Sequence, residues 1–451
     1  YMKLVIALVL LVLGSLLFHW WSPWWMTPIA SNWVAIDDTI ELTLYITGVV
    51  FVAVNLFMAW AIFRYRFDPS RRSHYEPENK KLEIWLTVIT SVGVAVMLAP
   101  GLVVWADFVN VPEDADEVEV VGAQWQWSYR FPGADGILGQ VDSRFISLDN
   151  PFGMSPNDEA GNDDVLISSN ELHLPIDRPV KLLLRSNDVL HDFAVPQFRV
   201  KMDLVPGMVT YVWLTPTRTG KFDILCMELC GIAHYTMRGH VVVDEQEDFD
   251  QWMSQQKTWS EIQSVPPGDP IAGKASYATC AACHGQLGEG NLAMNSPNLA
   301  ILQPWYITRQ INHFKDGIRG VNEADEFGRQ MAPMANMLID ETAIRNVAVY
   351  IGTLDPPATV NTLDGDVEKG AYFYNSCGAC HGAKAQGNYA LQAPRLAGQD
   401  DWYLKRQLKN FRLGVRGANE GDTYGHQMVL MARSIQNDQS INDLLAYINT
   451  L

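Results

Sequence analysis

The six cysteines of this chain fall into three close pairs, and each pair has a histidine nearby. In an exported protein six cysteines often form three disulfides, but thiols grouped with imidazole rings are typical of metal ligands. The grouping therefore favours metal centres over disulfide bonds. The pairs are Cys226/Cys230, followed by His234, and Cys280/Cys283 and Cys377/Cys380, each followed directly by a histidine.

Two of the pairs lie in Cys-x-x-Cys-His motifs, which are the attachment signature of a c-type haem. Near a helix end, two thiols with this spacing reach both vinyl groups of one porphyrin, and the next residue presents its imidazole to the iron. A zinc ribbon is the alternative, but it would need a second cysteine pair in each unit. The motif residues are Cys280, Cys283 and His284, and Cys377, Cys380 and His381.

Both motifs belong to an internal repeat, in which residues 271–354 align without a gap with residues 368–451. A methionine is the expected sixth ligand of each haem iron, because it raises the reduction potential relative to a second histidine. Only methionines present in both copies qualify. The repeat by itself leaves two pairs open, Met331 with Met428 and Met334 with Met431.

Each copy of the repeat is expected to form a small, mostly α-helical unit. Residues 342–354 and 440–451 have the apolar spacing of a closing helix. Burial of a haem would substitute for the core that such short units could not otherwise build. His313 and His426 have no histidine counterpart in the other copy, so we expect both at the surface.

The first cysteine pair lies in a short segment that also contains a histidine and a methionine. Soft sulfur ligands combined with imidazole favour copper, and two cysteines can bridge two metal ions, whereas a mononuclear blue-copper site needs only one. Zinc and buried thiols are the alternatives, but zinc rarely uses methionine. The candidate ligands are His191, Cys226, Cys230, His234 and Met237.

The elements that must position these ligands follow from the hydrophobic pattern. Short β-branched or aromatic runs, bounded by Pro, Gly and Asp, predict a small β-sandwich or barrel over residues 107–250. Residues 135–164 are rich in Gly, Asn, Asp and Pro, which predicts a long surface loop. A Pro-rich linker at 264–270 separates this region from the repeat.

Three uncharged stretches precede the β-region. Residues 42–63 and 84–106 each supply the roughly 20 apolar residues that a membrane-spanning helix needs. Residues 4–36 begin with an apolar core behind Lys3, as in a signal peptide, but no small-x-small cleavage site follows, so we expect a retained anchor. The loop between the second and third stretches is strongly basic and is therefore expected in the cytoplasm, with everything after residue 106 outside.

The formal net charge of −18 argues against nucleic acid as a partner, because phosphate binding requires a basic surface. An acidic surface could instead steer a basic donor protein towards the chain. The alternative is that the charge mainly keeps the protein soluble.

At the cysteine–histidine–methionine cluster the chain resembles subunit II of cytochrome c oxidase, in both ligand type and spacing. The resemblance implies a dinuclear copper centre (CuA) in a cupredoxin-like domain. Two cysteines would bridge the coppers, two histidines would each cap one, and a methionine and a backbone carbonyl would complete the ligation. By position these are Cys226 and Cys230, His191 and His234, and Met237 and Glu228, whose side chain would face the catalytic subunit.

Two further positions match the same family. Residues 124–130 resemble its aromatic segment, in which Trp125 matches the electron-entry tryptophan; the alternative is a core aromatic. Glu83 matches the glutamate at the mouth of a proton path; the alternative is a solvated acid at a helix start. The family's tryptophan is here displaced to Trp85, and its proline is replaced by Thr90.

The repeated units resemble the two-haem cytochromes c, in which the axial methionine lies seven residues before the leucine that opens the last helix. Counting back from Leu338 gives Met331, so the resemblance favours Met331 and Met428 as the axial ligands.

We therefore expect a multidomain membrane protein with N-terminal transmembrane α-helices, a cupredoxin-like β-sandwich or barrel, and two mostly α-helical cytochrome c domains. The expected parts are a membrane anchor (1–36), a transmembrane hairpin (37–106), the copper domain (107–254) and the two cytochrome c domains (268–356 and 365–451).

The resemblance implies an electron-transfer subunit II of a bacterial, proton-pumping cytochrome c oxidase, carrying a dinuclear copper and two haems c. The expected partners are the oxygen-reducing subunit I, subunit III, a cytochrome c-type donor and the lipid of the bacterial inner membrane, with the soluble domains on the periplasmic side. The alternatives are a membrane-tethered electron carrier for another terminal reductase, such as one for nitric or nitrous oxide, and a quinol oxidase subunit. A quinol oxidase subunit would lack the copper ligands.

Overall fold

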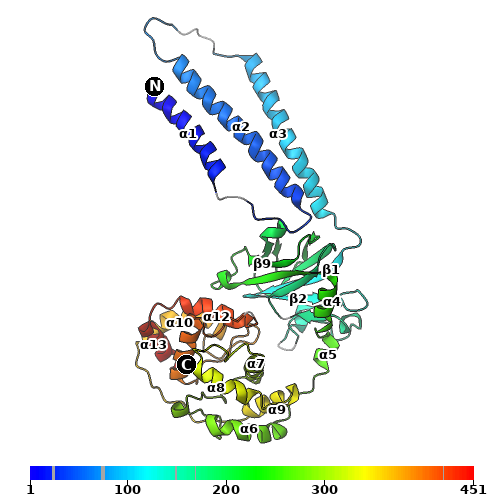
Figure 1. Cartoon of the computed structure of the whole chain (residues 1–451), viewed down its shortest axis with the longest axis vertical. Coiled ribbons are helices and arrows are strands. Elements are labelled where there is room, and N and C mark those ends of the chain that lie inside the picture. Colours follow the sequence, from blue (N-terminus) through cyan, green and yellow to red (C-terminus); the bar gives the residue numbers. More distant parts are fainter. Residues whose placement is uncertain (23–25, 73–76, 148–149, 168, 420) are drawn as a thin grey trace.

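Three long apolar helices lie at one end of the computed structural model, which describes residues 1–22, 26–72, 77–147, 150–167, 169–419 and 421–451 (Figure 1). They are α1 (Met2–Trp21), α2 (Val34–Arg64) and α3 (Lys80–Val109), and each is long and apolar enough to cross a membrane. Most of their apolar side chains face outwards, and no described residue of α3 is buried. Such helices need a surrounding lipid phase, because water would not solvate their surfaces.

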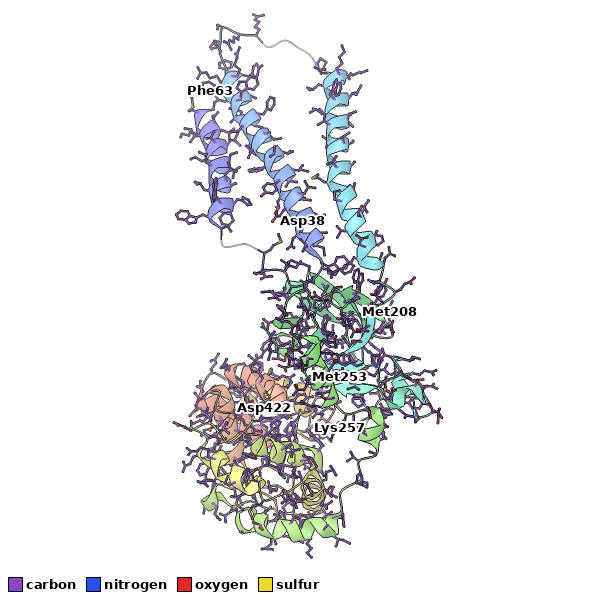
Figure 2. All side chains as sticks on the ribbon, turned by 45° about the vertical axis from the view of Figure 1, so that its right-hand side comes forward. Asp38, Phe63, Met208, Met253, Lys257 and Asp422 are labelled. Carbon is purple, nitrogen blue, oxygen red and sulfur yellow. The ribbon has the colours of Figure 1, made fainter. Side chains whose placement is uncertain are left out.

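The inner ends of these helices are attached to the β-region by side-chain contacts. Figure 2 shows Asp38 at the end of α2 nearest the β-strands and Phe63 at the opposite end. Beside Asp38, the carboxylate of Asp37 pairs with Arg199 at 2.7 Å. The buried indole of Trp33 donates from Nε1 to the carbonyl of Trp213 at 3.0 Å. These bonds fix the direction in which α2 leaves the β-domain.

The β-region is a sandwich of two five-stranded sheets, as predicted. One sheet has the order β3-β2-β1-β5-β8 and the other the order β4-β10-β9-β6-β7. The strands of the first sheet are β1 (Asp116–Ala123), β2 (Gln126–Phe131), β3 (Val165–Ile167), β5 (Val180–Ser186) and β8 (Thr210–Leu214). Those of the second are β4 (Glu171–Pro175), β6 (His191–Val195), β7 (Val200–Leu204), β9 (Gly220–Cys226) and β10 (Arg238–Asp244).

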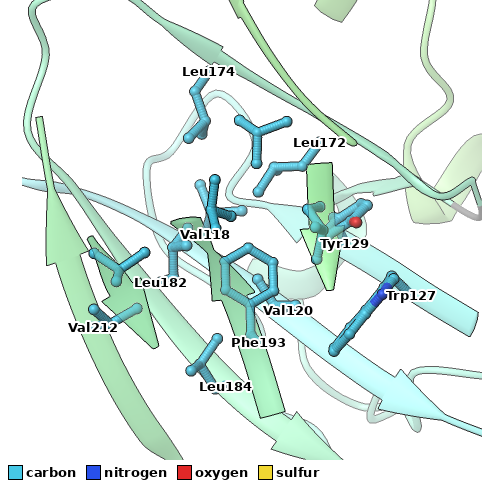
Figure 3. Close-up of a cluster of buried hydrophobic side chains, with 14 of the residues drawn as sticks. Val118, Val120, Trp127, Tyr129, Leu172, Leu174, Leu182, Leu184, Phe193 and Val212 are labelled. Carbon is cyan, nitrogen blue, oxygen red and sulfur yellow. The ribbon is translucent and has the colours of Figure 1, made fainter. Parts of the chain in front are cut away.

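The core of the sandwich comes from alternating side chains of both sheets (Figure 3). In β5 the burial alternates at every residue, so that Val180, Leu182 and Leu184 point inwards. Phe193 from the second sheet packs edge-on against Trp127 from the first, with ring centroids 5.6 Å apart. This core holds the ends of β6 and β9 rigidly, and the predicted copper ligands begin at those ends.

The segment 135–164 is not the simple surface loop that its composition predicted. Phe152 and Met154 are 1% exposed and pack with Trp259 into a small satellite core. Asp164 is fully buried and pairs with Arg130 at 2.5 Å, and Arg130 also pairs with Glu119 at 2.7 Å. Composition indicated the turns in this segment but could not reveal a buried charge network that depends on β1 and β2.

Helices α4 (Gln246–Ser254) and α5 (Trp259–Gln263) lead to the repeated region. The first unit contains α6 (Pro270–His284), α7 (Pro304–Lys315), α8 (Glu326–Ala335) and α9 (Glu341–Ile351). The second contains α10 (Val367–His381), α11 (Asp401–Arg412), α12 (Thr423–Arg433) and α13 (Asp438–Ile448). The predicted closing helices correspond to α9 and α13.

In both units the first helix crosses the last at a glycine. A Cβ added at Gly273 would collide with the carbonyl oxygen of Asn346, and one added at Gly370 with that of Asp443. The two glycines occupy the same position of the repeat, so the same close crossing is built twice. It sets the distance between the Cys-x-x-Cys-His helix and the closing helix in each unit.

The two cytochrome units pack against each other, and each contributes the same face to the interface. Arg319 of the first unit donates to Tyr403 and Gln407 of the second, each at 3.2 Å. The repeat counterpart of Arg319, Arg416, donates to Tyr306 at 2.9 Å and to Gln310 at 2.8 Å. The interface therefore has an approximate twofold symmetry.

One of the two histidines expected at the surface lies in this interface. His313 is only partly accessible, with its Nδ1 3.7 Å from a carboxylate oxygen of Asp422, so that expectation was wrong. Its position depends on the second unit packing against α7, which a histidine without a counterpart does not reveal. His426 is exposed, as expected.

Candidate metal centres

The cysteine–histidine–methionine cluster lies where β6 and β9 end and one loop returns to β10. His191 is the first residue of β6 and Cys226 the last of β9. The thiol sulfurs of Cys226 and Cys230 are 3.7 Å apart, and Cys226 Sγ lies 4.0 Å from His191 Nδ1. Cys230 Sγ lies 3.4 Å from His234 Nδ1. Sulfur and imidazole nitrogen atoms therefore converge on a small volume.

The remaining two predicted ligands lie in the same place. The thioether sulfur of Met237 is 3.9 Å from Cys230 Sγ, and the carbonyl oxygen of Glu228 is 3.3 Å from Cys226 Sγ. The structure thus brings together all six residues that the sequence indicated. The two sulfurs in the middle, with one imidazole beyond each, form a donor set that fits a pair of soft metal ions.

The two thiols at the centre lie within hydrogen-bond distance of each other. This interaction lowers the pKa of Cys226 to about 3 and raises the pKa of Cys230. Both thiols must lose their protons when they bind metal ions, so the low pKa of Cys226 favours metal binding there.

Asp188 orients the first histidine. A carboxylate oxygen of Asp188 lies 2.8 Å from Nε2 of His191, which leaves Nδ1 facing Cys226. Burial opposes protonation of His191, but the hydrogen bonds with Asp188 and Cys226 raise its pKa overall. Such an outer partner fixes the ring and the tautomer of a metal-binding histidine. Asp188 was not predicted, because nothing in its sequence context distinguishes it from a turn residue.

Trp125 lies directly beside the cluster. Its indole Nε1 donates to the carbonyl of Cys230 at 3.2 Å, and the side-chain amide of Gln124 donates to the same oxygen at 2.7 Å. Gly231 adopts a φ of +123°, and a Cβ there would lie 3.0 Å from the Trp125 ring. The glycine therefore permits the indole to approach the loop closely.

In the two repeated units, each Cys-x-x-Cys-His motif ends the first helix with its histidine pointing inwards. Nδ1 of His284 lies 2.9 Å from the carbonyl of Pro297, and Nδ1 of His381 lies 2.7 Å from that of Pro394. A carbonyl can only accept, so Nδ1 carries the proton and Nε2 keeps its lone pair. Burial lowers the pKa of both histidines, which keeps them neutral and able to bind iron.

The second unit contains a largely apolar cavity with about 1320 Å³ of empty space, part of it open to solvent. Its walls bring together the predicted residues of the second haem site with two arginines and several apolar side chains. The size and lining suit a porphyrin. The predicted residues in the wall are Cys377, Cys380, His381 and Met428, and the alternative ligand Met431 lines the cavity as well.

Two arginines of this cavity indicate an anionic group. Arg416 is 7% exposed and Arg309 is partly buried, and the Nε of each is buried without a hydrogen-bond partner. Arg309 belongs to the first unit, so the first unit contributes part of the wall of the cavity in the second unit. Buried guanidinium groups with unsatisfied donors fit the carboxylates of a haem. The sequence indicated Arg309 only as a repeated residue, and its role depends on the packing of the units.

The two candidate pairs for the axial methionine, Met331/Met428 and Met334/Met431, differ in their surroundings. Met331 is partly buried against the core of the first unit, whereas Met334 is 37% exposed. In the second unit, Met428 packs against Phe411 and Val429. The sulfur of Met431 is 3.1 Å from the hydroxyl of Tyr235 in the β-domain, so it is already engaged. Burial and partners thus favour Met331 and Met428.

The cavity of the second unit lies next to the sulfur cluster of the β-domain. Trp125 lines it, while Cys380 and Met431 pack against the core of the β-domain. The amide of Gln427 donates to the carbonyl of Trp125 at 2.7 Å, and Gln126 donates to the carbonyl of Ala390 at 3.0 Å. Trp125 therefore touches the cluster through Cys230 on one side and the cavity on the other.

Glu83 lies apart from these sites. It is exposed in the first turn of α3, at the end that lies away from the β-domain (Figure 1). Asn79 caps this helix by accepting from the backbone N–H of Leu82 at 3.1 Å.

Two protein families match this chain. Residues 117–245 match the periplasmic domain of cytochrome c oxidase subunit II, and residues 271–355 and 367–451 each match cytochrome c. An alternative cytochrome c oxidase subunit 2 of Bradyrhizobium diazoefficiens is 60% identical over 261 residues, which is 58% of this chain and 94% of the relative. A probable cytochrome c oxidase subunit 2 of Rickettsia bellii is 33% identical over 264 residues, covering 56% of this chain and 93% of the relative. Among solved structures, reduced cytochrome c4 of Pseudomonas stutzeri is 27% identical, covers 41% of this chain and 99% of its own, and has a TM-score of 0.34.

Proposed function

The chain belongs to the cytochrome c oxidase subunit II family, and we propose that it is the electron-transfer subunit of a bacterial, proton-pumping oxidase. The family match and the two cytochrome c matches imply that it binds copper and haem c. These groups supply reversible one-electron transfer when bound. The oxygen-reducing site belongs to another subunit of the complex.

In this proposal the sulfur cluster holds two copper ions. The paired sulfurs, one imidazole beyond each, and the nearby thioether and carbonyl support a dinuclear site over a mononuclear one. The rigid sandwich core holds the ligands in place before the metal arrives, and the buried walls exclude water. The ligands would be His191, Cys226, Glu228 (by its carbonyl), Cys230, His234 and Met237.

We further propose that each repeated unit holds one covalent haem. The cysteines of each motif would form the thioether bonds, and the histidine and methionine would be the axial ligands. The proline carbonyls hold the imidazoles in the tautomer required, and the interface arginines neutralise the carboxylates. The residues are Cys280, Cys283, His284 and Met331 in the first unit, and Cys377, Cys380, His381 and Met428 in the second.

The observation that carries the functional proposal is the position of Trp125. It is 5% exposed, bonded to the carbonyl of Cys230, and part of the wall of the second cavity. The protein thereby places one buried aromatic side chain between two sites for redox groups. This suits Trp125 as the entry to the copper site. From the sequence resemblance around Glu83, we further propose that this residue lies at the mouth of a proton path.

The complex would lie in the bacterial inner membrane, with α1–α3 spanning it and the soluble domains on the periplasmic side. Its partners would be the oxygen-reducing subunit I, subunit III and a cytochrome c-type donor. The exposed side chains of Met227 (52%) and Leu229 (77%) flank Glu228 on the sulfur-cluster loop and leave an apolar surface there for a partner subunit.

The proposal is tested by purifying the chain from its native membranes with its partners. We expect two copper ions and two haems per chain, oxygen consumption with reduced cytochrome c, and a co-purifying haem–copper subunit. Cys226→Ser should remove the electron paramagnetic resonance signal of the copper pair while the haem content stays unchanged. A partner that reduces a nitrogen oxide, or a preparation that consumes no oxygen, would contradict the oxidase assignment.

A further inference from the structure

The second unit rests on the β-domain through three side-chain contacts. Gln126 donates to the carbonyl of Ala390 at 3.0 Å, and Gln427 donates to that of Trp125 at 2.7 Å. The hydroxyl of Tyr235 lies 3.1 Å from the sulfur of Met431. Ala390, Gln427 and Met431 therefore define one face of the second unit, and the β-domain lies against that face at these three points.

The repeat places a second copy of this face on the first unit. The counterparts of Ala390, Gln427 and Met431 are Ala293, Gln330 and Met334, and all three are exposed. Because both units have the same fold, the three counterparts also share one face. Figure 1 shows the first unit (α6–α9) on the side of the repeated region away from the β-domain.

This face is more apolar on the first unit than on the second. Met337 is 58% exposed and Ile339 is 84% exposed, whereas the second unit has the polar residues Ser434 and Gln436 at these positions. Leu292 (55%) and Met294 (47%) add further apolar surface beside Ala293. Such surface is costly to leave in water, and contiguous apolar surface with a polar rim is typical of an interaction site.

The rim of the exposed copy is acidic. Glu326, Asp340 and Glu341 are exposed there, with Arg329 as the basic residue among them. The second unit carries Thr423, Asn437 and Asp438 at the positions of the three acids and His426 at that of Arg329. These positions therefore carry one more net negative charge in the first copy. Together with the net charge of −18, this rim would attract a partner whose contact surface is ringed by lysines.

We propose that this face of the first unit, formed by Leu292, Met294, Met334, Met337 and Ile339, is the docking surface for the external electron donor. The donor is a small soluble redox protein with an apolar contact patch ringed by basic side chains. The inference rests on the proposed function. On the second unit, the counterpart Met431 lies against the β-domain, and the exposed counterparts Ser434 and Gln436 are polar. A donor therefore reaches the chain through the first unit and not at Trp125, which is buried.

The test exchanges residues between the two copies. Met337→Ser with Ile339→Gln gives the first unit the residues of the second, which the same fold already tolerates. Ser434→Met with Gln436→Ile is the matched control. Binding of zinc-substituted, lysine-rich cytochrome c to the complete complex is measured by fluorescence titration. We expect the first pair to raise the Kd about tenfold or more, because two apolar contacts are lost, and the control pair to leave it unchanged.

A third variant tests the charge of the rim. Asp340→Asn retains a helix-capping side chain, because Asn437 caps α13 at the same position. It should slow reduction of the haems by reduced cytochrome c at low salt, and the difference from the unaltered protein should shrink as salt is added. Haem content and the dithionite-reduced spectrum should stay unchanged in all variants.

The docking face is overturned if the Met337/Ile339 exchange binds the probe like the unaltered protein, or if the Ser434/Gln436 exchange alters binding instead. Probe binding and oxygen consumption together distinguish a failure of the docking surface from a failure of the proposed function. A complex that binds the probe at this face, yet passes no electrons to oxygen, would contradict the oxidase assignment and leave the docking surface standing.

Discussion

Within the sulfur cluster, the chemistry of each residue is set by one or two neighbours. The hydrogen bond between the two thiols lowers the pKa of Cys226, and Nδ1 of His191 faces inwards because Asp188 holds the other ring nitrogen. The haem histidines follow the same rule, with a proline carbonyl in the role of Asp188. In each case an outer partner prepares the ligand before the metal arrives.

The proposed assignment of Met331 and Met428 as axial ligands can be tested by substitution. We predict that Met331→Ala, and separately Met428→Ala, each abolishes the charge-transfer absorption band of one methionine-ligated ferric haem, because the iron loses its sulfur ligand. Met334→Ala and Met431→Ala are the matched controls and should retain both bands. The measurement is the near-infrared spectrum of the oxidised protein. Loss of a band in a control variant and not in its partner would reverse the assignment.

Sequence alone was informative for residues whose chemistry depends on spacing along the chain. The proposed copper ligands from Cys226 to Met237 lie in one short loop, so their types and intervals already restricted the site. The roles of Arg309, Tyr235 and Asp188 could not be read this way. Each acts through a partner that is distant in sequence or through a ring orientation, and both are products of folding.

Among the elements, a buried arginine joins the first sheet to its long loop. Arg130 on β2 pairs with Glu119 on β1 and with Asp164, and it donates to the carbonyl of Gly139 at 2.7 Å. Arg185 on β5 pairs with the other oxygen of Glu119 at 2.9 Å. The charges are desolvated together, so removal of one leaves the others without compensation.

We predict that Arg130→Leu destabilises the β-domain by about 3–5 kcal/mol, because Glu119 and Asp164 would remain buried without a partner. Arg144→Leu is the control, since Arg144 is 81% exposed in its pair with Asp142 and should contribute less than about 1 kcal/mol. Differential scanning calorimetry of the purified complex would compare the unfolding transitions. Equal losses in the two variants would show that the buried network adds no stability.

The helices of the two units meet at Arg416, which gives a second prediction for the elements. Burial alone would lower the pKa of the Arg416 guanidinium, but electrostatic interactions with Tyr306, Tyr403 and Asp422 raise its pKa overall, so it remains charged. A fixed positive charge beside a haem stabilises the reduced form. Arg416→Met should therefore lower the reduction potential of one haem by about 60 mV, a tenfold change in a one-electron equilibrium.

The control for this prediction is Arg412→Met. Arg412 is the last residue of α11, four positions before Arg416. It pairs with Asp438 outside the cavity, at 3.0 Å. Potentiometric titration of the haem absorption should show both potentials unchanged in this variant. If Arg416→Met leaves both potentials in place as well, the cavity arginines do not face a haem.

For the elements, the hydrophobic pattern predicted the right kinds of structure. The strands, the closing helices and the three apolar helices follow from local periodicity. The burial of Phe152 and Met154, and the position of His313, did not follow, because both result from packing between segments distant in sequence. Polar composition predicts turns well and predicts burial poorly.

For the whole molecule, the charge of the loop between α2 and α3 predicts an orientation in a membrane. The described part of the chain between α2 and α3 includes Arg66, Arg71 and Arg72, which the positive-inside rule places in the cytoplasm. The β-domain and both cytochrome units would then lie together on the outer side, as Figures 1 and 2 arrange them.

We predict that a cysteine introduced by Ser70→Cys reacts with a membrane-impermeant thiol reagent in inverted vesicles but not in intact cells. Glu113→Cys, on an exposed residue just after α3, should show the opposite pattern. Mass spectrometry of the labelled chain measures both. Labelling of Ser70→Cys from outside would reverse the orientation, and labelling of both positions from one side would show that α3 does not span the membrane.

The interface between the two cytochrome units has a further consequence. It is isologous: the arginine of each copy contacts the tyrosine and glutamine of the other. This is the geometry of a two-fold homodimer, here made from one chain. An isologous contact uses up the same patch on both members, so it closes the assembly. The pair is therefore closed, and a third copy of the unit could not form the same contact, because the arginine, tyrosine and glutamine of both units are already engaged.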